Sequence, residues 1–164
     1  MPPEATTDAF TGDGYFRTGD IAVRRHDGRF RLIGRVKDMF KSGGYNVYPR
    51  EVEAAIEEHP AVASAIVTPQ QDPLWQEVGV AFVVPKPGMN LDRLDEWVRR
   101  RLANYKCPKH YVVASSLPLL STGKVDRTAL QKLATRQAIS SGSPSSASNI
   151  DGASGQILDD RKRC

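Results

Sequence analysis

Two uninterrupted apolar segments limit the folds that are open to this chain. They are "AVASAIV" at residues 61–67 and "VGVAFVVP" at residues 78–85, and neither alternates between apolar and polar residues. Alternation is typical of a strand with one face in water, whereas strands without it are covered on both faces. We therefore expect two neighbouring strands in a sheet that has packing partners on both sides.

The segment before these strands predicts a covering helix. It begins at Pro49, carries Glu51 and Glu53 in its first turn, where acidic groups favour the helix dipole, and ends before Pro60. Its apolar residues recur with the period of one helix face. The residues expected on the buried face are Val52, Ala55, Ile56 and His59.

Two further helices and a third strand are predicted after residue 85. Asn90 can cap one helix, "HYVVAS" at 110–115 has the composition of a strand, and Asp126 can cap the last helix. The stripe of the first of these helices is Leu91, Leu94, Trp97, Val98 and Leu102, and that of the last is Leu130, Leu133 and Ala134. The adjacent arginines at 99–101 indicate a solvated helix face rather than a binding patch.

A β-hairpin is predicted near the N-terminus. Residues 15–34 contain two β-rich halves separated by Asp27-Gly28, a dipeptide that favours a tight hairpin turn. Because an isolated hairpin is only marginally stable in water, we expect it to pack against something larger. The order of the later elements, with helices against a short mixed sheet, predicts an α+β fold with about three packed helices.

Composition and charge exclude several classes of protein. The chain has 164 residues, enough for one domain core, a net charge of +4 and only two cysteines, at 107 and 164. We expect a cytoplasmic protein with no disulfide framework, no secretion signal and no transmembrane segment. The basic residues are mixed with acidic ones, so no nucleic-acid partner is expected. Residues 138–164 are rich in serine and glycine and predict a disordered tail.

Three separated motifs carry a resemblance to a known family. They are "GYFRTGD" at 14–20, "GRVKDMFKSGGYNVYPREVE" at 34–53 and "LPLLSTGKVDR" at 117–127. The last contains "STGK", but Pro118 and Val125 occupy positions where a phosphate-binding P-loop needs glycine and Ser or Thr. In this order and at these distances, the motifs resemble the C-terminal part of the acyl-adenylate-forming superfamily, and within it the AMP-forming acyl-CoA synthetases.

The resemblance implies a two-step ligase reaction and a division of the chain. A carboxylate and ATP would give acyl-AMP and pyrophosphate, and coenzyme A would then give acyl-CoA and AMP, with Mg²⁺ present and a fatty or aryl acid as the small-molecule substrate. Residues 1–34 would be a leader and a hairpin left over from the large N-terminal domain. Residues 35–37 would be a hinge, 38–137 the AMP-binding enzyme C-terminal domain, and 138–164 the tail.

The first two motifs imply a nucleotide contact and a hinge. Asp20 and Arg35 match residues that contact the ribose of ATP, a role that suits a fixed carboxylate and a guanidinium that does not titrate. The alternatives are a turn-capping acid and an ordinary cation at a strand end. Lys37 matches the hinge, where an exposed and unbranched residue is free to change its backbone angles, whereas proline is not.

The other matches imply catalysis and thioester formation. Lys124 matches a lysine that would offset negative charge at the reacting phosphorus during adenylation. Lys41, Gly43 and Gly44 match the loop that enters the site for thioester formation, where a backbone without Cβ atoms can approach the pantetheine arm. The alternatives are a solvated loop lysine at 124 and two glycines that only mark a loop.

Three functions remain open on the sequence. The first is a lid domain of an acyl-CoA ligase, inactive without a large-domain partner that holds most of the ATP, the Mg²⁺ and the acid. The second is a stand-alone binding module that keeps the fold without turnover. The third, a basic nucleic-acid binder, has neither an aromatic stacking pattern nor a concentrated cationic face.

Overall fold

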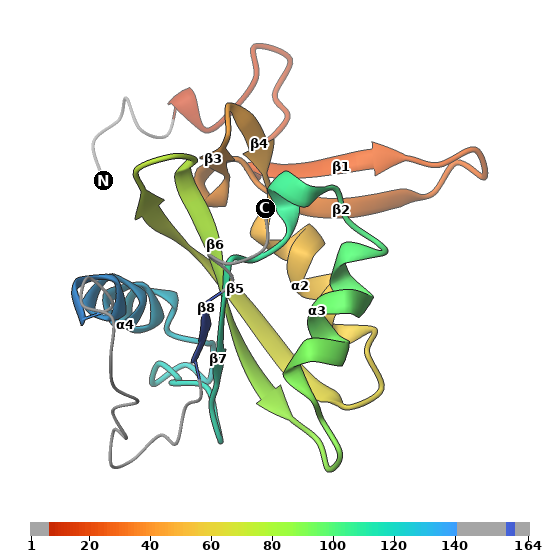
Figure 1. The fold of residues 1–164 in the computed structure, drawn as a ribbon. Helices are drawn as coiled ribbons and strands as arrows, with labels where there is room; N and C mark the ends of the chain where they lie inside the picture. The colour runs from red at the N-terminus through yellow and green to blue at the C-terminus, as the bar shows by residue number, and fades with distance from the viewer. Residues whose placement is uncertain (1–6, 141–156, 160–164) are drawn as a thin grey trace.

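The strands form two separate sheets (Figure 1). The structure, a computed structural model, describes residues 7–140 and 157–159. The smaller sheet is a hairpin of β1 (Asp20–Arg24) and β2 (Phe30–Arg35). The other elements, in chain order, are η1 (Val36–Asp38), β3 (Phe40–Ser42), β4 (Tyr45–Val47), α2 (Pro49–Glu57), β5 (Val62–Asp72), β6 (Gln76–Pro85), α3 (Leu91–Arg99), η2 (Asn104–Lys106), β7 (His110–Val113), α4 (Arg127–Ser140) and β8 (Ile157–Asp159), where η denotes a single 3₁₀ turn.

Strand β6 organises the larger sheet and makes it mixed. It pairs antiparallel with β5 along nearly its whole length and parallel with β7. Its first residue pairs with β3, which carries β4, and β7 pairs with β8. The predicted α+β class, with a hairpin followed by a short mixed sheet, is confirmed.

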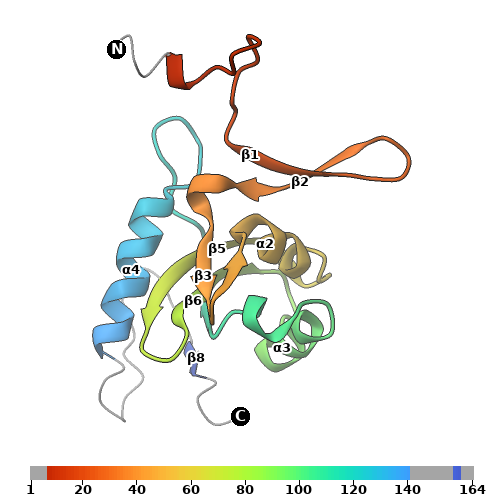
Figure 2. The same ribbon diagram turned by 90° about the horizontal axis from the view of Figure 1, so that it is seen from above.

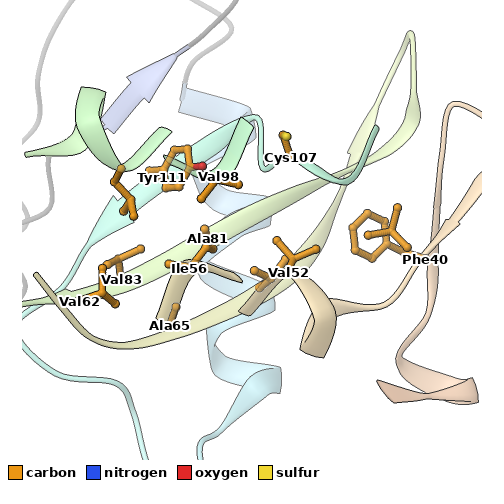
Figure 3. Packing of buried hydrophobic residues seen from close by; sticks show 13 residues of the cluster. Phe40, Val52, Ile56, Val62, Ala65, Ala81, Val83, Val98, Cys107 and Tyr111 are labelled. Carbon is orange, nitrogen blue, oxygen red and sulfur yellow. The ribbon is translucent and has the colours of Figure 1, made fainter. Parts of the chain in front are cut away.

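Helices cover both faces of this sheet, with α2 and α3 on one face and α4 on the other (Figures 1 and 2). Along β6, Ala81 and Val83 belong to the cluster under α2 and α3, whereas Val80 and Phe82 belong to the cluster under α4. Figure 3 shows Ala81 and Val83 within the first cluster. Successive residues of a strand point to opposite faces, so coverage on both sides accounts for the uninterrupted apolar segment.

The three main helices begin where the sequence predicts. Pro49 is the first residue of α2. The Asn90 side chain accepts a hydrogen bond from the Arg93 amide at 3.0 Å, and the Asp126 side chain accepts one from the Ala129 amide at 2.9 Å. Both caps satisfy amides of a first helical turn that have no partner within the helix.

Some expectations differ from the structure in detail. Residues 40–42 and 45–47 form β3 and β4, where no strand was predicted. The sequence did not indicate them because three-residue strands around a Gly-Gly turn are too short to show periodicity. Of the stripe predicted for α4, Leu130 and Ala134 are buried against the sheet, but Leu133 is 39% exposed, since the residues that meet the sheet follow the four-residue spacing. His59 is only partly buried.

Part of the predicted tail is described. Residues 138–140 continue α4, and residues 157–159 form β8. The other residues predicted for the tail lie outside the described part of the chain.

The hairpin projects away from the rest of the molecule (Figures 1 and 2). Phe30 is 71% exposed and Leu32 is 65% exposed. Only its base is covered, where Gly34 of β2 lies against the side chain of Tyr48. Within residues 7–140 and 157–159, every helix is too short or too polar to span a bilayer.

Candidate functional site

Asp20 and Arg35 meet at the base of the hairpin. They are cross-strand partners at the first residue of β1 and the last of β2, and Arg35 Nε donates to Asp20 Oδ1 at 2.8 Å. Both side chains are partly exposed. Thr18 Oγ1 accepts a hydrogen bond from the Asp20 amide at 3.1 Å. The pair presents carboxylate acceptors beside guanidinium donors, which is a combination that suits vicinal hydroxyl groups.

Lys37 lies directly between this pair and the larger sheet. It is exposed within η1, the single turn that joins the hairpin to β3. A cavity of about 300 Å³ adjoins the turn, and its walls include Lys37, Thr68 and Arg127. A turn of this kind, with open space beside it, can change its backbone angles without disturbing a packed core.

The loop that carries Lys41, Gly43 and Gly44 joins β3 to β4. Gly43 has φ +56°, and a Cβ atom there would lie 2.8 Å from Cε3 of Trp75, so only glycine fits beneath this ring. The Gly43 amide donates to the Trp75 carbonyl at 2.8 Å. The Lys41 amide donates to Glu77 Oε2 at 3.1 Å, which ties the loop to the start of β6.

Aromatic and basic side chains around this loop escaped the sequence analysis. The rings of Tyr45 and Tyr105 stack with centroids 4.5 Å apart. Lys109 Nζ lies 4.7 Å from the centre of the Trp75 ring. These residues come from β4, η2 and the connections next to β6 and β7, so no local pattern in the sequence brings them together.

Lys124 lies on an exposed loop before α4. The Leu120 amide donates to the Lys124 carbonyl at 2.8 Å, and the Asp126 amide donates to the Pro118 carbonyl at 2.8 Å, so the loop is closed at its base. Gly123 has φ +78°, which lets the chain turn just before the lysine. Among the described residues the Lys124 amine has no ion pair, and it is available to a ligand.

The structure brings together only some of the predicted site residues. Asp20 and Arg35 are in contact, and Lys37 follows them within two residues. In Figure 1 the hairpin and the β3–β4 turn lie at the top, whereas the turquoise loop that carries Lys124 lies at the lower left. The two loops expected to act in the two steps are therefore on different sides of the small domain.

Glu53 and Arg127 are polar residues whose contacts the sequence did not reveal. The Glu53 side chain is 1% exposed, and both of its oxygens accept a hydrogen bond from Arg127 Nη2, at 2.8 and 3.0 Å. The sequence placed Glu53 in a first helical turn on dipole grounds alone. Its partner is 74 residues away, so the buried pair could not be read from sequence spacing.

Comparisons with known proteins identify the domain. Residues 51–124 match the family model of the AMP-binding enzyme C-terminal domain. The chain is 44% identical over 125 residues to a feruloyl-CoA synthase of Amycolatopsis, covering 75% of this chain and 25% of that protein. It is also 42% identical over 130 residues to a long-chain-fatty-acid–CoA ligase of Bacillus subtilis, covering 78% of this chain and 23% of that protein.

A solved structure agrees with these sequence relatives. The amide bond synthetase McbA from Marinactinospora thermotolerans superposes with a TM-score of 0.75 at 33% identity, over 81% of this chain and 28% of that one. The chain thus spans about a quarter of the length of the proteins that it matches. These matches show that the chain carries an AMP-binding enzyme C-terminal domain of the acyl-CoA synthetases and related adenylate-forming enzymes.

Proposed function

We propose that this chain is the lid domain of an ATP-dependent, AMP-forming acyl-CoA ligase. It would act with a large domain that binds ATP, Mg²⁺ and the acid, and it would be inactive without that domain. The observation that carries the proposal is the placement of two glycine-bearing loops on different sides of one small domain, with an exposed turn at Lys37 leading into it (Figure 1).

Such a placement suits a lid that presents one side for each half-reaction. Rotation about residues 35–37 would bring the Lys124 loop to the pocket for adenylation and the β3–β4 loop for thioester formation. The cavity beside Lys37 supports this role, since the turn has room to move. Lys37→Pro would then fix one orientation, retaining one half-reaction and losing the other.

In the first step the acid's carboxylate attacks the α-phosphorus of ATP and pyrophosphate leaves. The Lys124 amine, exposed and without an ion pair among the described residues, would approach the carboxylate and α-phosphate and offset their growing negative charge. Asp20 and Arg35 would hold the ribose hydroxyls, with the second carboxylate oxygen and the outer guanidinium nitrogens facing the nucleotide.

In the second step the thiol of coenzyme A attacks the acyl carbon and AMP leaves. The open side of Gly44, where a Cβ atom would meet nothing within 4 Å, supports close passage of a pantetheine arm along the β3–β4 turn. Lys41 is exposed next to this turn and would interact with an oxygen of the substrate. We propose a fatty or aryl carboxylate as the acid, with its selectivity set by the large domain.

A chimera tests the proposal directly. In it, this chain replaces the matching C-terminal quarter of the Amycolatopsis feruloyl-CoA synthase, and pyrophosphate release is followed with ATP, Mg²⁺ and ferulate. We expect turnover from the chimera, and none from the truncated synthase or from this chain alone. Lys124→Ala in the chimera should slow adenylation by a barrier increase on the order of 3 kcal/mol.

The alternative function has its own signature in this experiment. If the truncated synthase regains activity with its own C-terminal quarter but the chimera only binds ATP, the chain is a binding module and not a lid. If Lys37→Pro lowers adenylation and thioester formation equally, residues 35–37 are not the hinge.

A further inference from the structure

The buried pair of Glu53 and Arg127 connects helix α2 to the first residue of α4. Glu53 is enclosed almost completely, and Arg127 is 39% exposed. Both short contacts come from one guanidinium nitrogen, Nη2, and hydrogen bonds between charged groups are stronger than those between neutral ones. Glu53 Oε2 also lies 3.6 Å from Arg50 Nη1, but the two short contacts with Arg127 are the ones that join α2 to α4. Removing one partner of a buried ion pair is strongly destabilising, so the two residues hold their elements together.

The same pair also contacts the backbone of β5. Glu53 Oε1 accepts from the Val67 amide at 3.0 Å, and Arg127 Nη1 donates to the Val67 carbonyl at 3.3 Å. Among the described strands, β5 pairs only with β6, so alternate residues along it direct their backbone groups away from that partner. Glu53 and Arg127 together satisfy the outward-facing amide and carbonyl of one such residue.

Glu57 makes a similar contact one helical turn later. Its Oε1 accepts from the Ala65 amide at 3.4 Å, and its Oε2 accepts from Arg50 at 2.9 Å. Four residues of helix rise about 6 Å, and two residues of strand rise only slightly more, so the two carboxylates match alternate amides. The hydrogen bonds that Glu57 makes in the described structure go to Arg50 and Ala65 and not to α4, which separates its role from that of Glu53.

Arg127 follows Lys124 by three residues, at the base of the loop. The base is closed by the hydrogen bond from the Asp126 amide to the Pro118 carbonyl, and the Asp126 side chain caps α4. Loop and helix start therefore move as one unit. Since Glu53 fixes Arg127 against α2 and β5, it also fixes the direction in which the loop leaves the domain.

We infer that Glu53, acting through Arg127, is a positioning residue for Lys124. Its part in adenylation rests on the proposed function, but its structural part does not. The electrostatic contribution of a lysine depends on its placement to within fractions of an ångström. A loop released from Glu53 would keep the amine but present it over a wider range of positions.

Hydrogen exchange on the full chain tests the structural part. The variants are Glu53→Gln, which removes the charge but keeps the shape, and Glu57→Gln as the matched control on the same helix. We expect exchange of the Leu120 and Asp126 amides to rise by about tenfold or more in Glu53→Gln and to stay within about twofold in the control. Equal exchange in the two variants would overturn the inference.

Amides in the centre of β6 report whether the variants remain folded. Where Glu53→Gln fails this check, Arg127→Lys replaces it, because lysine keeps the positive charge but has no second nitrogen to bond Glu53 and the Val67 carbonyl at once. The same rise at Leu120 and Asp126 is expected, and an unchanged loop would count equally against the inference.

The chimera tests the catalytic part by separating the half-reactions. We expect Glu53→Gln to slow pyrophosphate release by about tenfold, while thioester formation from supplied acyl-AMP stays within about twofold. An equal loss in both steps would show a general structural role and no positioning of Lys124. If the unmodified chimera has no adenylation activity, the proposed function fails, and hydrogen exchange alone decides whether Glu53 holds the loop.

Discussion

The packed domain and the β1–β2 hairpin are both regular structure, but they are stabilised in different ways. In the domain, Ile56 is 0% exposed among α2, α3 and the sheet, whereas in the hairpin Leu32 is 65% exposed. The hairpin is held by its strand pairing and by contacts at its base. Backbone pairing alone contributes little net stability in water, so the hairpin is expected to be the less stable of the two regions.

This difference separates a region with enclosed apolar clusters from one without. The domain has two apolar clusters enclosed by its own helices. The hairpin presents Phe30 and Leu32 to solvent, together with the side chains that would contact the nucleotide at its base. A large domain packed against the hairpin would bury these apolar residues and bring Asp20 and Arg35 to the pocket, as the proposed function requires.

The largest effect that we predict comes from apolar truncation in each region. Ile56→Ala should lower the free energy of unfolding by about 2–5 kcal/mol, because it leaves a cavity in an enclosed cluster. Leu32→Ala should change it by less than about 0.5 kcal/mol. Urea unfolding followed by tryptophan fluorescence measures both, and a comparable loss in Leu32→Ala would mean that the hairpin is part of the cooperative core.

A smaller effect is predicted for two glycines that share a left-handed backbone. Gly28, in the hairpin turn, has φ +81° and open space around it, whereas Gly43 has φ +56° and lies beneath Trp75. Gly28→Ala should cost about 1 kcal/mol for the backbone, and Gly43→Ala about 1–2 kcal/mol more, because the ring must move.

The same urea titrations give these two values. Because both positions carry the backbone penalty, the difference between them isolates the packing of the domain. Equal losses would show that Trp75 yields freely and that the loop is as loosely held as the hairpin turn.

The smallest predicted effect is a loss of stability in alkali that originates in the domain. Burial, and then the nearby Asp95 carboxylate, raise the pKa of Tyr111 well above its usual value of 10.0. Burial also raises the pKa of the Cys107 thiol. The unfolded chain therefore loses these protons first, and stability is complete below the ordinary pKa values and falls as the pH rises above them.

The free energies of unfolding at pH 8 and pH 11, obtained from urea titrations, should differ by about 1 kcal/mol because of Tyr111 alone. Tyr111→Phe should reduce this difference. A variant that keeps the full alkaline loss would show that Tyr111 is not its source.

Much of the domain was predictable because its signals are local. The proline at 49 and the side chains of Asn90 and Asp126 mark helix starts whatever the rest of the chain does, and each was confirmed. The two unbroken apolar segments identified β5 and β6, although β5 extends to Asp72, beyond its apolar part. Strand pairing there continues through polar residues, which a hydrophobic pattern does not register.

The candidate site was less predictable, because its contacts link distant segments. Asp20 and Arg35 were named from motifs, but their 2.8 Å ion pair depends on the hairpin register and its bulge. Trp75 over Gly43 and Arg127 beside Glu53 join positions 32 and 74 residues apart, and nothing in either neighbourhood specifies the other. Such contacts form only in the tertiary structure, once the helices and strands have packed together.

The carboxylates of α2 that bond the outer edge of β5 reduce the tendency of the protein to aggregate with itself. A bare strand edge recruits strands from neighbouring molecules, and fibrous aggregates grow in this way. Here the outward amides of Ala65 and Val67 are already bonded to Glu57 and Glu53, so they are not open to a strand from another molecule. If the domain rotates as we propose, this protection would let it leave one position for the other without pairing with strands of neighbouring molecules.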